Sequence, residues 1–380
     1  MHLKQLISFP ICLKDIETFS FYWAAVSVAL PWNITSLFFI MGIFGIYLRR
    51  HELLVENQLR ILGIGFALWT LLYSLFFTTN IDHSVKGAYD MVRGLCLFPM
   101  AYLFIKDIEA KPSLTLYTQV IAWLLLIGNW VIPQPGNFFG YWVNPNNVAV
   151  SVWLMLLLAI PIRYSWVKRY RIANAVMWLG LLSSIGLLML SNSRGQWLGA
   201  TVAIGLYLAL SRIRFRYYWL AGLGVAFSLA LFFVNYKGFA LDNRSQIWLP
   251  LFNVTTEHHP LFGYGINSVQ AVLTKLGINQ QEDVQTAHNI FLEVYVSTGI
   301  SGLILFLSWL GYALKFFISK TYRDSLLFFA GLSGLASFFV MGQFDLKLAS
   351  YRYIGVMAIF FAYLYLAIAQ QSPKDTTEHN

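Results

Sequence analysis

Residues 290–314 read IFLEVYVSTGISGLILFLSWLGYAL, a stretch in which Glu293 is the single charged residue. A bilayer core about 30 Å thick is crossed by a helix of about 20 mostly apolar residues. This stretch has that length and composition, and similar apolar runs recur at short intervals from Phe19 to Ala369. The sequence therefore predicts an all-α integral membrane protein.

The composition supports the same conclusion. Of the 380 residues, 58% are hydrophobic and 11% are charged, against about 25% charged residues in an ordinary soluble domain. This excess of apolar side chains needs lipid to cover it. Residues 1–380 are expected to form a single polytopic membrane domain, which ends in a polar, disordered cytoplasmic tail at residues 370–380.

The apolar runs predict about twelve transmembrane helices, at residues 19–31, 34–48, 61–78, 88–105, 114–132, 147–162, 174–190, 196–211, 217–235, 290–314, 324–341 and 351–369. The residues between the first two helices also allow one long, kinked span. A long connection, residues 236–288, joins the ninth and tenth helices. It mixes apolar and turn residues, so we expect it to fold.

The basic residues indicate the orientation of the chain. Its formal charge is +9, but Lys and Arg cluster on alternate connections, which reports membrane topology and not nucleic-acid binding. With both termini in the cytoplasm, 18 of the 26 basic residues lie on the cytoplasmic side, and the opposite orientation leaves eight there. The connection at residues 236–288 is therefore expected on the outer face.

Eight basic residues remain outside or at the outer ends of helices. They are Lys86, Arg93, Arg194, Lys237, Arg244, Lys275, Lys347 and Arg352. Arg93 lies within the fourth predicted helix, where an arginine costs up to about 3 kcal/mol. Such a residue needs an anionic partner, and the sequence leaves open whether this is Asp90, one turn earlier, or a bound phosphate.

Arg194 lies in the polar turn Ser191-Asn192-Ser193-Arg194-Gly195, directly before the eighth predicted helix. Free backbone N–H groups and the helix dipole favour an anion at such a terminus. An arginine is explained there if a phosphate lies between it and the helix. The alternative is an arginine that extends to the membrane interface.

His288 ends the long outer connection, and Asn289 is expected to cap the tenth helix. The helix dipole disfavours a cationic imidazolium at that end, so a neutral imidazole that accepts a proton is expected. A purely structural histidine at the interface is the alternative. Glu293, one turn into the helix, either orients His288 or is solvated.

Other patterns limit the chemistry. His258 and His259 are adjacent, and neighbouring residues rarely ligate one ion well, so no metal site is predicted. Gly263 and Gly265 either let the backbone approach a ligand or form turns. The sequence contains no P-loop, dinucleotide-binding glycine pattern or nucleophile elbow. An enzyme here would need an activated donor in the membrane, and a sugar on a lipid diphosphate meets this need without a cofactor.

In these residues the chain resembles the superfamily of O-antigen ligases and polymerases, polytopic inner-membrane glycosyltransferases of bacteria. The resemblance covers residues 191–310 in detail. It rests on Ser193-Arg194-Gly195, on Arg244 with Trp248, on residues 260–265, and on His288-Asn289 followed after nine residues by Gly299 and Gly302. The last pattern is similar to the signature of the ligase branch, whereas Trp248 stands where ligases often have leucine.

The resemblance implies a GT-C-like, multi-pass protein of the bacterial inner membrane with a periplasmic active site. It implies transfer of an undecaprenyl diphosphate-linked O-antigen glycan to lipid A-core without a metal. Arg194 and Arg244 would bind the diphosphate, and His288 would take the proton from the acceptor hydroxyl. The further candidates for substrate contact are Lys86, Arg93, Gly263 and Gly265.

Three alternatives stay open. An O-antigen polymerase uses the same donor with a lipid-linked acceptor. A flippase or other transporter of lipid-linked oligosaccharides predicts ionisable groups at the bilayer midplane, whereas those of this chain are expected at the outer edge. A structural or assembly protein does not require Arg194, Arg244 and His288 to converge.

Overall fold

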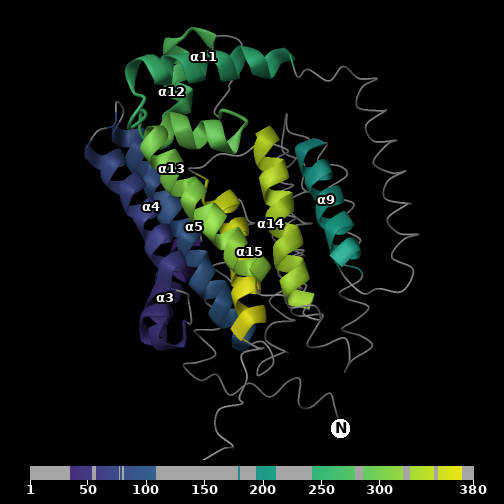
Figure 1. Cartoon of the computed structure of the whole chain (residues 1–380). Helices are drawn as coiled ribbons and strands as arrows, with labels where there is room; N and C mark the ends of the chain where they lie inside the picture. The colour runs from purple at the N-terminus through teal and green to yellow at the C-terminus, as the bar shows by residue number, and fades with distance from the viewer. Residues whose placement is uncertain are drawn as a thin grey trace, which may run out of the picture. The chain divides into compact units, whose positions relative to one another are not determined.

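The computed structural model describes residues 35–53, 57–76, 78, 81–107, 179, 194–210, 242–278, 286–319, 326–345 and 350–369. Within these ranges the chain forms helices joined by turns, and no strand occurs among them (Figure 1). Over the described residues, the prediction of an all-α fold is confirmed. The chain divides into two compact units, one formed by residues 1–54, 95–196 and 358–380 and the other by residues 55–94 and 197–357.

Seven of the predicted helices fall on described residues, and all seven are present. They are α3 (Thr35–Leu48), α4 (Asn57–Phe76), α5 (Ile81–Asp107), α9 (Arg194–Leu210), α13 (Ile290–Ser319), α14 (Leu326–Asp345) and α15 (Tyr351–Ala369). The long connection contributes two more, α11 (Asp242–His258) and α12 (Val269–Lys275). Apart from Leu179, the described residues do not include the predicted helices at 19–31, 114–132, 147–162, 174–190 and 217–235, or the tail at 370–380.

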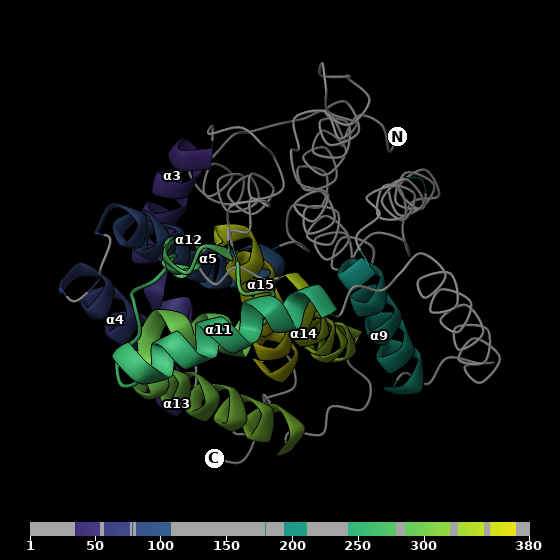
Figure 2. The ribbon, with the colours of Figure 1, turned by 90° about the horizontal axis from the view of Figure 1, so that it is seen from above.

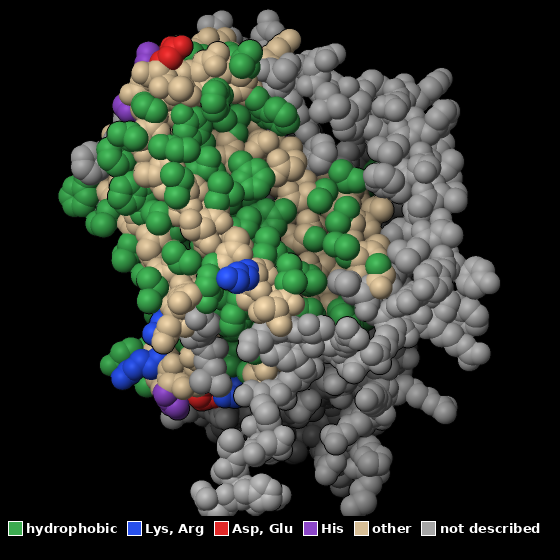
Figure 3. Space-filling view, viewed as in Figure 1, with side chains coloured by type: hydrophobic (Ala, Val, Ile, Leu, Met, Phe, Trp, Pro, Cys, Tyr) green, Lys and Arg blue, Asp and Glu red, His purple; other side chains and the backbone are tan. Residues whose placement is uncertain are grey.

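Apolar side chains face outward along the second unit. On α4 the exposed large side chains recur every three or four residues, at Ile61, Ile64, Leu68, Leu72 and Phe76, and on α13 they are Ile300, Ile304, Leu307, Leu314 and Ile318. Figure 3 shows hydrophobic side chains side by side over the flank that α4 and α13 form. A soluble protein turns such a stripe toward its core, and a large exposed apolar surface marks a membrane or a partner.

Two described helices satisfy the length and composition of a membrane span. They are residues Ile81–Lys106, within α5, and Ile290–Ser319. α5 begins seven residues before the helix predicted at 88–105, because its first two turns are polar and hydropathy detects only the apolar part.

α13 consists of two segments that meet at Gly299. This glycine has φ 67° and ψ −170°, a conformation that is essentially restricted to glycine. The first segment, residues 290–298, lies beneath α11 and points in a different direction from the second. The second segment, residues 300–319, runs beside α4 (Figures 1 and 2). The span expected at 290–314 is therefore broken at Gly299.

A break in a helix leaves backbone groups without their partners in the helix, and residues 260–265 supply new ones. The N–H groups of Tyr264 and Gly265 donate to the carbonyls three and two residues before the break, at 2.8 and 3.0 Å. The N–H of Ile300, directly after the break, donates to the carbonyl of Pro260 at 2.9 Å. The returning chain thus replaces the missing helical hydrogen bonds.

The same part of the chain is bound to α4 and α5 by side-chain hydroxyls. Tyr73, Thr78 and Ser84 donate to the carbonyls of residues 263, 264 and 266, at 2.9, 3.2 and 3.0 Å. Buried backbone carbonyls need such partners. Residues 260–266 are therefore bound on one side by α13 and on the other by the ends of α4 and α5.

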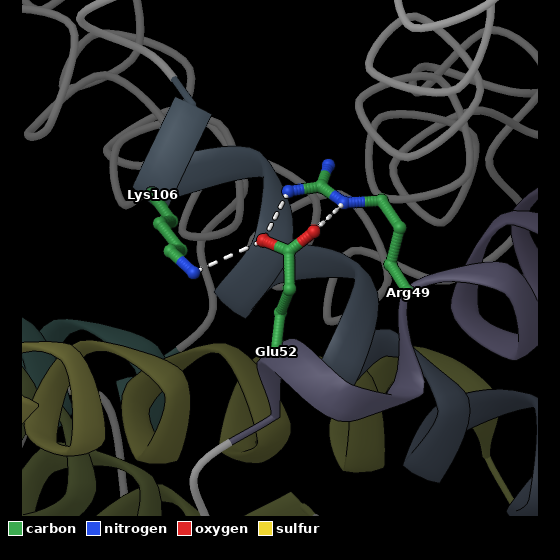
Figure 4. A network of polar contacts seen from close by, with 3 residues as sticks. All are labelled: Arg49, Glu52 and Lys106. Atoms are coloured by element: carbon green, nitrogen blue, oxygen red, sulfur yellow. Dashed lines mark hydrogen bonds and ion pairs between the residues drawn. The ribbon is translucent and has the colours of Figure 1, made fainter.

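In the first unit, Glu52 joins two connections (Figure 4). It lies in the short helix η1 (Arg50–Glu52), and both of its carboxylate oxygens accept from Arg49 at 2.7 Å. Lys106, near the end of α5, donates to the same carboxylate at 3.0 Å. The connection after α3 and the end of α5 therefore lie close together. The Arg49 hydrogen bonds are the main cause that lowers the pKa of Glu52 to about 2.

Replacing Gly299 by alanine is expected to destabilise the protein by about 2 kcal/mol or more, because the φ of Gly299 strains any side chain and the new methyl would meet the backbone of Leu261 and Phe262. Thermal unfolding in detergent measures this effect. Gly311→Ala, in the second segment of α13 with nothing near its Cβ position, is the control and should unfold at or slightly above the wild-type temperature. Equal melting temperatures for Gly299→Ala and the wild type would show that the break is absent.

The charge on Glu52 is expected to stabilise the protein by about 1 kcal/mol near neutral pH, since ion pairs close to the surface are worth about that much. Its folded-state pKa of about 2 lies below the ordinary 4.5, so the contribution is complete above pH 4.5 and declines as the pH falls toward 2. Melting temperatures of wild type and Glu52→Gln should differ by a constant amount near neutral pH and converge below pH 4.5. A difference that persists unchanged under acid would contradict the assignment.

Candidate functional site around His288

Of the three residues predicted to carry the chemistry, His288 is the one whose side chain the structure describes. It is half-buried, and its φ of 51° lies in the left-handed region that residues other than glycine rarely adopt. Arg244 lies on α11, and Arg194 is the first residue of α9. The side chains of both arginines lie outside the described part of the chain.

Side chains hold both backbone groups of Ala287, the buried residue before His288. The N–H of Ala287 donates to Oε2 of Glu293 at 2.9 Å, and its carbonyl accepts from Nε1 of Trp248 at 2.8 Å. Glu293 belongs to α13, whereas Trp248 comes from α11, 39 residues earlier than Ala287. The chain that leads into His288 is therefore anchored on two different helices.

The residue after His288 is anchored as well. Oδ1 of Asn289 accepts from the N–H groups of Phe291 and Leu292, both at 3.0 Å, and its Nδ2 donates to Oε1 of Gln343 on α14 at 3.1 Å. The first contacts are those of a helix N-cap, so the predicted capping role of Asn289 is confirmed. His288 thus lies between two fixed residues.

Glu293 is buried, with 1% of its surface exposed. The alternative that it is merely solvated is therefore wrong. A buried carboxylate is costly unless it accepts hydrogen bonds, and Glu293 receives one from the backbone of Ala287. Through this hydrogen bond Glu293 holds the residue that precedes His288.

A hydrophobic cluster places α11 over the His288 turn. The cluster joins α11, α12 and the first segment of α13, and consists of Ile247, Leu251, Tyr264, Val269, Val272, Leu273, Ala287 and Val296. Trp248 packs against it. Arg244 lies one helical turn before Trp248, so the two positions share a face of α11. The indole of Trp248 reaches Ala287, and the approach of Arg244 to His288 stays a prediction.

α14 contacts both the beginning of α9 and the His288 turn. A Cβ atom added at Gly199 of α9 would meet the side chains of Met341 and Ser337 on α14, so the two helices approach closely there. Gln343, two residues further on α14, binds Asn289. The first turns of α9 that belong to the second unit therefore lie near the His288 turn. Arg194 itself belongs to the first unit, and its approach to His288 stays a prediction.

Lys86 and Arg93 both lie on α5. Lys86 is exposed and follows Ser84, whose hydroxyl binds the carbonyl of Ile266. Arg93 is 6% exposed and lies near the middle of the 27-residue helix, because α5 begins earlier than predicted. Arg93 and Asp90 both have interactions within the protein. Contact of Lys86 and Arg93 with a substrate stays a prediction.

The two predicted substrate-binding glycines pack against the protein itself. A Cβ atom at Gly263 would lie 2.6 Å from the backbone nitrogen of Gly299. At Gly265 it would meet the hydroxyls of Thr78 and Ser84. Both glycines have positive φ, 71° and 98°, so turn formation and close packing already explain them. A role for them in binding substrate stays a prediction.

The histidine pair of the long connection lies beside this core. The ring of His259 packs on Tyr264 with 4.3 Å between the ring centres. Burial is the main cause that lowers the pKa of His259, and the nearby His258 and Lys275 lower it further. Within the described ranges, no group of three or more His, Cys, Asp or Glu residues could hold a metal ion.

Two residues that hold the His288 turn, Trp248 and Gln343, were not predicted to do so from the sequence. Trp248 was noted as a departure from the ligase pattern, but its hydrogen bond to a residue 39 positions away has no signal in the sequence. Gln343 lies within an apolar helix, where a lone amide is expensive. The position of Gln343 in an apolar helix therefore indicated that its side-chain amide has a polar partner.

These features define a class: α-helical proteins with apolar outer surfaces and a polar turn held at one end of the helices. Residues 178–307, which include α11, α12 and His288, match a family model described as O-antigen ligase. The match supports the O-antigen ligase superfamily, which the resemblance predicted. Among curated proteins no match was found.

Asn289→Ala is expected to destabilise the protein by about 1 kcal/mol, because the first turn of α13 loses its N-cap. Asn289→Asp keeps an oxygen that accepts from the same N–H groups and should retain most of the stability. Gln343→Ala removes the link to α14 alone and serves as the matched control. Thermal unfolding of the three variants measures the effect. If Asn289→Ala unfolded at the temperature of Gln343→Ala, capping would contribute nothing.

Proposed function

We propose that the chain is an O-antigen ligase, which transfers an O-antigen glycan from undecaprenyl diphosphate to lipid A-core. The observation that carries the proposal is the His288 turn. A histidine in a rare backbone conformation is held from both sides by α11, α13 and α14, within the segment that matches the O-antigen ligase family. Strained residues that their surroundings hold in place cluster at functional sites.

In the proposed reaction the acceptor hydroxyl attacks the anomeric carbon of the donor. The oxygen–carbon bond forms while the bond from that carbon to the diphosphate oxygen breaks, and His288 takes the hydroxyl proton. The electron pair of the broken bond leaves with the diphosphate. Arg194 and Arg244 stabilise its negative charge. A direct displacement inverts the anomeric carbon and requires no metal or other cofactor.

The proposal also sets the membrane arrangement. The chain crosses a bacterial inner membrane about twelve times in a GT-C-like fold, with both termini in the cytoplasm. The end that carries α11, α12 and the His288 turn faces the periplasm, where residues 236–288 form the long loop. Lys86 and Arg93 on α5 are second candidates for phosphate contact, and Gly263 and Gly265 for contact with the glycan.

Two specific observations favour alternative functions. Trp248 stands where ligases often have leucine, which favours an O-antigen polymerase with the same donor and a lipid-linked acceptor. A transporter of lipid-linked oligosaccharides would place ionisable groups near the bilayer midplane, and Arg93, buried within α5, is the described residue that such a function would use. The ligase is preferred because of the histidine pattern at residues 288–302.

Reconstitution of the purified protein with an undecaprenyl diphosphate-linked glycan and lipid A-core, in the presence of a chelator, tests the proposal. Glycan joined to lipid A-core is expected, as detected by product size. His288→Ala should reduce the rate by about 100-fold or more, because general-base catalysis contributes 10²–10⁴-fold. His288→Asn is the matched variant, since asparagine tolerates positive φ but cannot act as the base.

Elongated lipid-linked glycan in place of the lipid A-core product would identify a polymerase. Absence of a covalent product with either acceptor, although the donor binds, would overturn the enzymatic proposal in favour of transport. Full activity of His288→Asn would show that His288 is not the base.

A further inference from the structure

We infer that Trp248 and Glu293 are positioning residues for His288, and that they act through the backbone of Ala287. The inference rests on the proposed role of His288 as the base and deepens it. Neither residue contacts the reacting atoms in this proposal. Each fixes a peptide group on which the direction of the imidazole depends.

The first step is a matter of backbone geometry. The φ of His288 is the rotation between the peptide group formed with Ala287 and the Cα of His288. Trp248 holds the carbonyl of that peptide group at 2.8 Å. Glu293 holds the N–H of the preceding peptide group at 2.9 Å. Two successive peptide groups before His288 are therefore fixed in orientation.

The second step concerns the other side of His288. Asn289 is fixed as the N-cap of α13 and by its bond to Gln343. Because the peptide group before His288 and the side chain of Asn289 after it are both anchored, the dihedral angles between them have little freedom. The φ of 51° is disfavoured for a residue with a Cβ and persists when the surrounding structure imposes it. The sign of φ decides on which side of the chain the imidazole leaves the backbone.

The third step is the chemistry of the two side chains. A leucine or phenylalanine at position 248 would fill space against the hydrophobic cluster but has no N–H to donate. The indole has one donor, and its partner is the carbonyl of Ala287. Glu293 is a carboxylate in a position with 1% exposure, where an apolar side chain would cost less. Both residues are thus better explained by their bonds to Ala287 than by packing.

Trp248 also links His288, the proposed base, to Arg244, the proposed diphosphate-binding residue, because Trp248 and Arg244 lie on the same helix. Arg244 lies one turn earlier on α11, so the proposed leaving-group cation and the anchor of the base occupy the same helix. Loss of the indole N–H should therefore impair the alignment of His288 with the bound donor more than the binding of the donor. The loss should therefore lower kcat and leave KM for the donor nearly unchanged.

The test measures kcat and KM for the lipid-linked donor in Trp248→Phe, Glu293→Leu and Glu293→Gln. Trp309→Phe makes the same replacement on the second segment of α13, away from the turn, and is the control. Trp248→Phe and Glu293→Leu are expected to lower kcat about tenfold or more, because small misplacements of a catalytic group are costly, with KM within about twofold. Glu293→Gln keeps an oxygen that accepts from Ala287 and should restore most of the rate.

Hydrogen exchange of the peptide that contains residues 286–292 gives a readout independent of activity. Trp248→Phe should accelerate exchange there and leave α14 unchanged, whereas Trp309→Phe should leave this peptide as in the wild type. If Glu293→Leu does not fold, Trp248→Phe decides the question alone.

The inference is overturned if Trp248→Phe retains wild-type kcat and exchange while His288→Ala is inactive, and the proposed function then stands. It is also overturned if Trp248→Phe raises KM and leaves kcat unchanged. If His288→Ala and His288→Asn remain fully active, the proposed base is wrong, and the positioning inference fails with it.

Discussion

The hydrogen bonds around the break at Gly299 are the interaction on which the second unit depends. Without them, α13 would end with free carbonyls and resume with free N–H groups in a buried place, which is expensive. Residues 260–265 bind both sets, and the hydroxyls of Tyr73, Thr78 and Ser84 bind the carbonyls of the same part of the chain. Because the long connection returns to this point, α11 and α12 are held against the first segment of α13.

The break at Gly299 also positions the residues that hold the His288 turn. The first segment of α13, redirected at Gly299, supplies Glu293, and the helix that packs across it supplies Trp248. Glu293 and Ala287 both precede the break, so the first segment carries their contact to the place where α11 packs. The break therefore turns the first segment of α13 away from the direction of the second. This first segment holds the residue before His288.

The exposed apolar side chains of α4 and α13 and the buried polar contacts have one physical explanation. Where lipid covers the flank, the hydrophobic effect cannot drive helices together, and polar contacts and close packing do so instead. Asn289 with Gln343, and Gly199 against Met341 and Ser337, are contacts of these two kinds. They join α14 to Asn289 and to α9, so both kinds of contact act on the helix that binds the His288 turn.

The sequence by itself determined the helices that fall on described residues, several to within two residues at each end, because a membrane span is recognised from local hydropathy alone. It also predicted the cap at Asn289, since a cap is formed by residues close together in the chain, and a resemblance to O-antigen ligases, which the family match over residues 178–307 supports. The break at Gly299 escaped detection because the apolar run continues through it, and the early start of α5 because its first turns are polar. Only the tertiary structure decided that Trp248 and Glu293 meet at Ala287 and that Gln343 holds Asn289, since pairs 39 and 54 residues apart are joined by packing and leave no local pattern.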